Sequence, residues 1–235
     1  MDTITKENIG SADLKITKQH FIVPVPYKKE DAIYYLLKRS FDVVMASILI
    51  LVLLSWLYPL MFILINVSSK GGTLFIQKRV GLRGKVFNCF KFRTMVINKE
   101  SDLVEAALND KRITKIGKLL RMTYIDELPQ LFNVLLGDMS IVGPRPHMLY
   151  HHRKFCQEIP LYNYRHQVKP GITGLSQVKG YHGSVFDHYR IYGRTRLDLF
   201  YVRKASLKLD LIILVKTGLI ICSFNKKQKK CEIVH

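Results

Sequence analysis

The longest apolar segment of the chain runs from Val43 to Val67 without a charged residue. Its 25 residues would reach roughly 38 Å as a straight helix, against a membrane hydrocarbon core of ~30 Å. Pro59 interrupts the segment, and a proline inside a helix removes a backbone donor and kinks or breaks the helix. The 16 residues before Pro59 and the 8 after it are each too short to cross. Length alone therefore permits a span, whereas the proline predicts a membrane break at Pro59.

Basic residues flank this apolar segment on both sides. They are Lys28, Lys29, Lys38 and Arg39 before it, and Lys70, Lys78, Arg79, Arg83 and Lys85 after it. Because positively charged flanks tend to stay in the cytoplasm, both ends of the segment are expected on that side. We therefore predict a re-entrant helix that dips into the membrane and returns, with a single bent transmembrane helix as the alternative.

Alternating apolar and polar positions predict a small β-hairpin after the membrane segment, with strands over residues 73–80 and 85–92 around a glycine-containing turn. Helical spacing follows at residues 101–109 and 112–121. The second of these helices has a basic face and an apolar face, which is typical of a helix on a membrane surface. A further helix is expected from Asp126 to Leu136, with a glycine at its C-terminal cap.

Residues 207–224 are apolar, but they contain Asp210 and Lys216, so an interfacial or docked helix fits better than a spanning one. Together these elements predict an α+β, helix-dominated fold. It would be a monotopic membrane protein with a proline-broken re-entrant helix, a small β-hairpin and amphipathic interfacial helices.

The net charge of the chain limits the kinds of molecule that we expect it to bind. Lys and Arg number 37 against 18 Asp and Glu, which gives a net charge of +19. Such an excess of positive charge favours a negatively charged binding partner: a phospholipid surface, a phosphorylated substrate or nucleic acid. The four cysteines show no metal-binding spacing, so we expect free thiols in a reducing compartment. The eight histidines lack ligand spacing as well, and we interpret them as core or surface residues.

Asp126 and Glu127 form the first candidate for chemistry, with Arg121 five residues earlier. Hard cations such as Mg²⁺ bind carboxylate oxygens together with substrate phosphate oxygens, and a free carboxylate can attack phosphorus. The alternative is that Asp126 caps a helix and Glu127 is solvated.

Two further motifs place cations where they can bind phosphate. Lys91 and Arg93 lie two residues apart at the end of the second predicted strand, and a forked arginine beside a lysine suits a diphosphate. The prolines on either side of Arg145 restrain the backbone around its guanidinium. A solvated strand face and a plain turn are the respective alternatives.

Taken in order, these segments resemble the monotopic bacterial phosphoglycosyl transferases, a family of bacterial sugar transferases. The segments that carry the resemblance are KRSFD (38–42), FIQKRVGLRGKVFNCFKFRTM (75–95), RITKIGKLLR (112–121), IDELPQLFNVLLGDMSIVGPRP (125–146) and VKPGITGLSQVKGY (168–181). The resemblance implies a cytoplasmic lead-in at 1–37, a re-entrant membrane helix at 38–68, a catalytic domain at 69–225 and a basic tail at 226–235. Its later part is most similar to the enzymes that load glucose or galactose phosphate onto undecaprenyl phosphate.

The resemblance also implies a reaction. A sugar 1-phosphate passes from a UDP-sugar to polyprenyl phosphate, with release of UMP, at the start of exopolysaccharide, capsule or other glycan assembly. In this family's scheme Asp126 attacks the β-phosphorus and holds the phosphosugar, while Glu127 helps to hold Mg²⁺. Arg121 and Arg145 match arginines placed near the phosphates. Lys91 and Arg93 match the family's strand motif.

The expected location is the cytoplasmic face of the bacterial inner membrane, in contact with anionic lipids. A second copy of the chain or downstream glycosyltransferases are left open as partners. The chain departs from the family pattern at the membrane break, where Tyr58 rather than serine precedes Pro59, and at Tyr181 and His182, where many members carry an arginine. Other classes of function are a membrane-tethered nucleic-acid-binding protein, which we do not expect, and an inactive scaffold.

Overall fold

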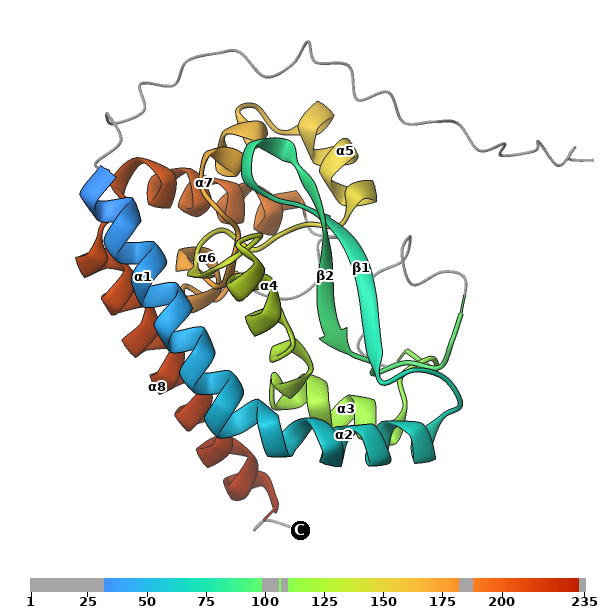
Figure 1. The fold of residues 1–235 in the computed structure, drawn as a ribbon. Helices are drawn as coiled ribbons and strands as arrows, with labels where there is room; N and C mark the ends of the chain where they lie inside the picture. Colours follow the sequence, from blue (N-terminus) through green and yellow to red (C-terminus); the bar gives the residue numbers. More distant parts are fainter. Residues whose placement is uncertain (1–31, 99–105, 107–109, 182–187, 233–235) are drawn as a thin grey trace, which may run out of the picture.

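The computed structural model describes residues 32–98, 106, 110–181 and 188–232, with no side chains placed at 188 and 224–232. It is dominated by helices, with one antiparallel hairpin and one short parallel strand pair (Figure 1). The helix-dominated α+β prediction is confirmed. Residues 1–31 of the lead-in expected at 1–37, most of the helix expected at 101–109, and His182 lie outside the described residues.

The elements follow one another in this order. The helices are α1 (Ala32–Leu49), α2 (Ser55–Ser68), α3 (Lys115–Met122), α4 (Gln130–Leu136), α5 (Leu149–Glu158), α6 (Leu175–Val178), α7 (His188–Lys204) and α8 (Leu207–Glu232). The strands are β1 (Leu74–Val80), β2 (Val86–Phe92), β3 (Ser140–Val142) and β4 (Gly171–Thr173). A π-helical turn spans Ile50–Leu54, and 3₁₀ turns span Leu82–Gly84, Ile125–Glu127 and Tyr162–Gln167.

The N-terminal helix stays helical through Pro59 and changes direction between α1 and α2 (Figure 1). The distortion is a π-helical turn at Ile50–Leu54, which ends five residues before Pro59. Ser55 Oγ donates to the Leu51 carbonyl at 2.6 Å there, a bond that often bends helices. By length and composition, Ala32–Ser68 is the described helix that qualifies to cross a membrane. Re-entry remains a prediction.

Three side chains near the middle of α1 attach it to the rest of the molecule. Arg39 donates to the carbonyls of Val134 and Leu135 at 2.6 and 2.9 Å, at the C-terminal end of α4. Asp42 is buried and accepts a hydrogen bond from the backbone N–H of Ile141. Lys38 pairs with Asp210 of α8 at 2.8 Å. The KRSFD segment is therefore a structural anchor.

The hairpin forms as predicted. Its register runs from Leu74 opposite Phe92 to Val80 opposite Val86. The turn closes through a hydrogen bond from Gly81 N to the Lys85 carbonyl at 2.8 Å.

The parallel pair β3–β4 was not predicted, because three-residue strands are too short to show periodicity and both neighbouring segments contain glycine and proline. Gly143 and Gly171 lie so close that a Cβ on Gly171 would come within 2.1 Å of Gly143 N. The glycines of these two segments are thus required by close backbone approach, and Gly171 begins β4.

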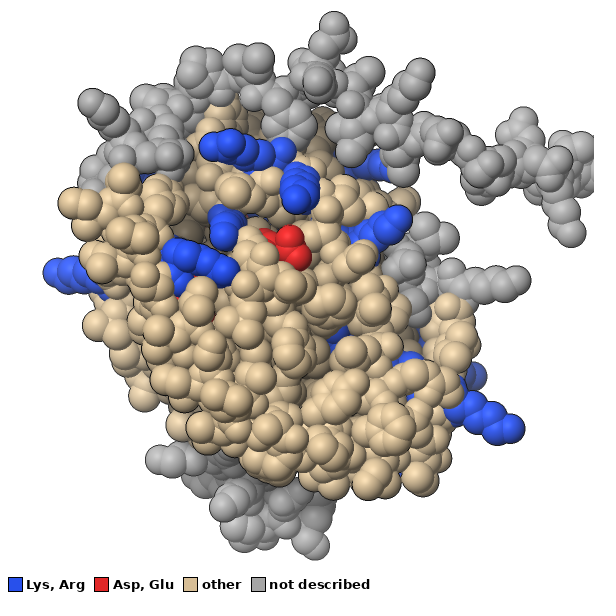
Figure 2. Space-filling model, viewed as in Figure 1, with Lys and Arg blue, Asp and Glu red and all other residues tan. Residues whose placement is uncertain are grey.

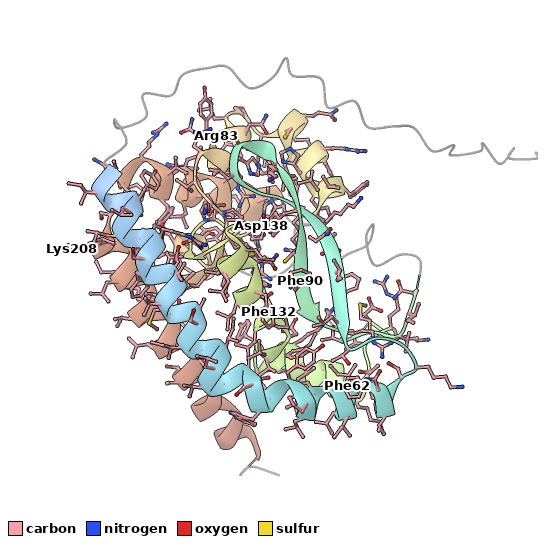
Figure 3. All side chains as sticks on the ribbon, in the orientation of Figure 1. Phe62, Arg83, Phe90, Phe132, Asp138 and Lys208 are labelled. Carbon is pink, nitrogen blue, oxygen red and sulfur yellow. The ribbon has the colours of Figure 1, made fainter. Side chains whose placement is uncertain are left out.

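One apolar core joins α1 and α8 to the rest of the chain. It includes Ala46 of α1, Cys89 of β2, Val134 of α4 and Ile213 of α8. The docked placement predicted for residues 207–224 is confirmed by this packing. Outward apolar side chains cover α1, α2 and α8, and charged side chains are sparse over that side of the molecule in Figure 2. In Figure 3, Phe62 lies on α2 and Arg83 lies at the turn between β1 and β2, at the other end of the molecule.

Candidate functional site

The two adjacent carboxylates lie in a short 3₁₀ turn, Ile125–Glu127, between α3 and α4. The residue before this turn, Tyr124, has a left-handed backbone with φ of 58°, which is uncommon for a residue with a side chain and occurs often at functional sites. The helix predicted from Asp126 begins only at Gln130, and Pro129 is its N-cap. The prediction placed that start too early, and the helix-capping alternative for Asp126 is wrong.

Glu127 is held by two cations from distant parts of the chain. Lys91 Nζ lies 2.8 Å from Oε1, and Arg145 Nη1 donates to Oε2 at 2.9 Å while its Nη2 contacts Oε1. Burial by itself raises the pKa of Glu127, but the charges of Arg145 and Lys91 outweigh burial and hold that pKa well below its ordinary value. Glu127 is therefore a stable anion, and it raises the pKa of Arg145 in turn.

Asp126 is also buried, yet its carboxylate makes no hydrogen bond or ion pair with any residue in the described part of the chain. Burial raises its pKa, an effect that Glu127 reinforces and that Lys91, Arg121 and Arg145 oppose. A buried carboxylate that has no partner among the described residues and lies near three cations is a candidate nucleophile toward an anionic substrate.

Arg121 lies at the end of α3, and its Nε donates to Thr94 Oγ1 at 2.8 Å. Gly117 of the same helix packs directly on this segment, since a Cβ there would come within 1.9 Å of the Thr94 carbonyl oxygen. The close packing of α3 on the residues after β2 thus sets the position of Arg121.

Arg93 differs from the other predicted cations. Its guanidinium is buried and donates to the carbonyls of Ser69 and Lys70 at 2.7 and 2.6 Å, where it holds the end of α2. Lys91, by contrast, reaches Glu127. The alternative of a solvated strand face is therefore wrong for both residues, and a phosphate-binding role for Arg93 stays a prediction.

All of these side chains border one cavity of about 960 Å³. The predicted residues that line it are Lys91, Arg93, Arg121, Asp126, Glu127 and Arg145. Pro59, the predicted membrane break, lies outside this lining. The structure therefore brings together the carboxylates and the cations that the sequence singled out in three separate motifs.

The sequence did not reveal the residues that position Arg145. Arg165 Nη2 donates to the Arg145 carbonyl at 2.7 Å and pairs with Asp198 Oδ2 at 2.6 Å, fully buried. Arg79 Nη1 donates to the Pro146 carbonyl at 2.6 Å. These partners come from β1, the Tyr162–Gln167 turn and α7, so no local pattern could have linked them.

Four histidines lie near the Tyr162–Gln167 turn, and each of them packs against other side chains of the protein. His147, His151 and His166 are buried, and His147 Nδ1 lies 2.5 Å from Tyr162 Oη. Burial and nearby arginines lower the pKa of His147. The fourth, His152, makes an edge-to-face ring contact with His166. The interpretation of these histidines as core residues is confirmed.

Free thiols are confirmed for the described cysteines, Cys89, Cys156 and Cys222. Among the residues that the structure describes, no three His, Cys, Asp or Glu side chains converge on a metal-sized site.

Known proteins resemble this chain over most of its length. A UDP-glucose:undecaprenyl-phosphate glucose-1-phosphate transferase from Klebsiella pneumoniae is 42% identical over 197 residues, which is 83% of this chain and 42% of that protein. An undecaprenyl-phosphate galactose phosphotransferase from Salmonella typhimurium is 41% identical, over 79% of this chain and 40% of that protein. The exopolysaccharide production protein PSS from Rhizobium leguminosarum is 40% identical, over 77% of this chain and 92% of that protein.

The chain spans about two fifths of the length of the Klebsiella and Salmonella relatives and nearly the whole of the Rhizobium protein. The sequence model of the family described as "Bacterial sugar transferase" matches residues 33–223, a range that begins in α1 and ends in α8. Both carboxylates and all of the cations around them lie within the matched range. The chain therefore belongs to the bacterial sugar transferase family.

Proposed function

We propose that this protein transfers a sugar 1-phosphate from a UDP-sugar to undecaprenyl phosphate and releases UMP. The names of the Klebsiella and Salmonella relatives describe this type of transfer. The observation that carries the proposal is that two buried carboxylates in one cavity differ in their partners. Glu127 binds two cations, whereas Asp126 has no hydrogen-bond or ion-pair partner among the described residues. The step would initiate assembly of an exopolysaccharide, a capsule or another glycan.

In the first half of the proposed reaction, a carboxylate oxygen of Asp126 attacks the β-phosphorus of the UDP-sugar. A P–O bond forms to Asp126, the bond from that phosphorus to the oxygen of the α-phosphate breaks, and UMP leaves. Lys91, Arg121 and Arg145 border the same cavity, where fixed positive charge stabilises the charge that develops on the phosphate oxygens. The product on the protein is an aspartyl-phosphosugar.

In the second half, an oxygen of undecaprenyl phosphate attacks the same phosphorus. The P–O bond to Asp126 breaks, which restores the carboxylate and gives undecaprenyl diphosphate sugar. Because each half replaces one bond to phosphorus by another, the scheme needs no oxidant, reductant or additional nucleophile.

Mg²⁺ is part of the proposal. Oε1 of Glu127 is occupied by both cations, but Oε2 accepts a single bond from Arg145 and keeps one acceptor position. One carboxylate oxygen together with substrate phosphate oxygens is a usual ligand set for Mg²⁺, so the residues fit. The ion would neutralise phosphate charge as UMP departs.

The proposed site of action is the cytoplasmic face of the inner membrane. The apolar surface of α1, α2 and α8 supports a membrane-bound position, and the net charge of +19 favours anionic lipids. Cysteine labels placed before residue 38 and after residue 70 should react from the same side if the helix is re-entrant. Labels on opposite sides would replace re-entry with a span.

The test of the reaction is UMP release by detergent-purified protein with Mg²⁺, undecaprenyl phosphate and a panel of UDP-sugars. Acceptor-dependent release with one donor, lost on chelation with EDTA, is the expected result and would name the sugar. Absence of release with every donor would favour the scaffold alternative. Nucleic-acid binding is not favoured, because the cations of the site face a cavity and its carboxylates.

A further inference from the structure

The last helix, α8, has two faces with different surroundings. On its inner face Ile213 is fully buried, and Thr217 Oγ1 lies 2.7 Å from Thr173 Oγ1 of β4. On its outer face three apolar side chains are more than half exposed: Leu211 at 61%, Val215 at 56% and Leu219 at 62%. The helix is thus attached to the catalytic domain on one side and presents an apolar surface on the other.

The cavity that contains Asp126 extends to the inner face of α8. The α8 residues that line it are Leu214, Thr217, Ile220 and Ile221. Their spacing of three and four residues places them along one helix face. Leu49 of α1, Leu131 of α4 and Ile141 of β3 line the same cavity.

The part of the lining that α8 and the end of α1 supply carries no charged side chain. The charged side chains of the lining come from other elements: β1, β2 and the residue after it, α3, the Ile125–Glu127 turn, the segment after β3 and α7. Further apolar side chains come from β1, β2 and residues 95–97. The outer faces of α1 and α8 are the exposed apolar surface described above, so the uncharged part of the cavity at α8 adjoins helices with an apolar outer surface.

A ligand that matches this lining has an anionic head and an apolar tail. A UDP-sugar is polar at both its uridine and its sugar end, so it leaves the apolar lining of α8 unmatched. The volume of about 960 Å³ lies at the upper end of the range of roughly 300–1,000 Å³ for small-molecule sites, which leaves room for more than the donor alone.

We propose that the inner face of α8, together with Leu49, binds the first isoprenoid units of the polyprenyl phosphate acceptor and directs its phosphate toward Asp126. The proposal rests on the proposed function, since it names the acceptor's site in the same cavity. The rest of the isoprenoid chain leaves the cavity beside α8 and continues into the membrane.

The test compares two neighbouring substitutions on α8. Ile220→Trp fills the cavity, whereas Leu219→Trp adds the same side chain on the outer face, at a residue that does not line the cavity. Each variant is assayed for the burst of UMP release without acceptor, which reports the first half-reaction. Each is then assayed for the KM of undecaprenyl phosphate in the full reaction.

Ile220→Trp should raise the acceptor KM by about 10-fold or more and leave the UMP burst unchanged, because a bulky ring excludes the apolar chain but not the donor. Leu219→Trp should leave both values within about 2-fold of wild type, as for surface substitutions. Equal acceptor KM values in the two variants would overturn the proposal, and so would a loss of UMP burst that matches the loss of transfer.

A labelling experiment on the wild-type protein does not depend on the folding of either variant. A polyprenyl phosphate with a diazirine in its first isoprenoid unit should label the peptide that contains residues 214–221. Labelling confined to peptides of α2 or α3 would contradict the proposed acceptor site. Absence of any UMP burst from the wild type, with any donor, would instead contradict the proposed reaction itself, so the two failures are distinguishable.

Discussion

Asp126 and Glu127 are neighbours in sequence and equally buried, yet their surroundings differ in kind. Both oxygens of Glu127 are engaged by Lys91 and Arg145, whereas the carboxylate of Asp126 has no hydrogen-bond or ion-pair partner in the described part of the chain. The same cavity therefore lowers the pKa of one carboxyl and raises that of the other. The contrast supports the proposed division of roles, in which Glu127 would keep the cations in place and Asp126 would be available for attack.

The largest effect should come from removing the unpaired carboxylate. Asp126→Asn should reduce UMP release by about 10³-fold or more, because no other group in the proposed scheme forms the bond to phosphorus. The measurement is single-turnover UMP release, with mass spectrometry of the Asp126 peptide for the phosphosugar. Asp126→Asn with full activity would remove Asp126 as the nucleophile.

Neutral substitutions of Asp126 and Glu127 should change the thermal stability of the protein in opposite directions. The raised pKa of Asp126 means that its ionised form is disfavoured in the folded state, so Asp126→Asn should raise the melting temperature at neutral pH. Glu127→Gln should lower it, since Arg145 and Lys91 are left without their anion, at a cost of roughly 3–5 kcal/mol. Thermal unfolding of both variants at one pH checks the signs, and equal shifts would contradict the division of roles.

On activity, Glu127→Gln should cost about 10²-fold, less than Asp126→Asn, because it weakens charge placement without removing the bond-forming group. Its dependence on Mg²⁺ concentration should move to higher values. An unchanged Mg²⁺ titration would exclude Glu127 as a ligand.

A smaller loss of activity should follow when the hydrogen bond from Arg165 to the backbone of Arg145 is removed. Arg165→Met removes the donor to the Arg145 carbonyl and leaves Asp198 buried without its cation, which costs roughly 3–5 kcal/mol of stability. Among molecules that remain folded, we expect about a 10-fold rise in the KM for the UDP-sugar. Ser176→Ala is the control, because it removes a neutral hydrogen bond to the same Asp198 without touching Arg145. Equal KM values in these two variants would show that Arg165 is only structural.

The smallest effect is a shift in pH dependence. Attack requires ionised Asp126, whose pKa burial raises, so the acid limb of the UMP burst should lie above the ordinary carboxyl value of about 3.9. Lys91→Met removes a charge that lowers this pKa, so the limb should move to higher pH. Burst rates measured across a pH series check the direction, and a limb that moves to lower pH would contradict the electrostatic account.

Much of the site was visible in the sequence. Adjacent carboxylates, a strand ending in two cations and an arginine between prolines were each recognised locally, and the structure places all of them around one cavity. The prediction for Arg93 and Lys91 shows the limit. Both were grouped by spacing, but one holds the end of α2 and the other pairs with Glu127.

By itself, the sequence determined the apolar helix, the hairpin and the identity of the two carboxylates, because local periodicity and residue type report directly on burial and backbone preference. Only the tertiary structure decided which carboxylate is paired and where the N-terminal helix bends. It also decided that Arg165, paired with Asp198, donates a hydrogen bond to the Arg145 carbonyl. The reason is physical: a pKa depends on every charge and on the solvent within a few ångströms, and the groups that surround Asp126 and Glu127 come from residues 91, 121 and 145, which only packing brings together.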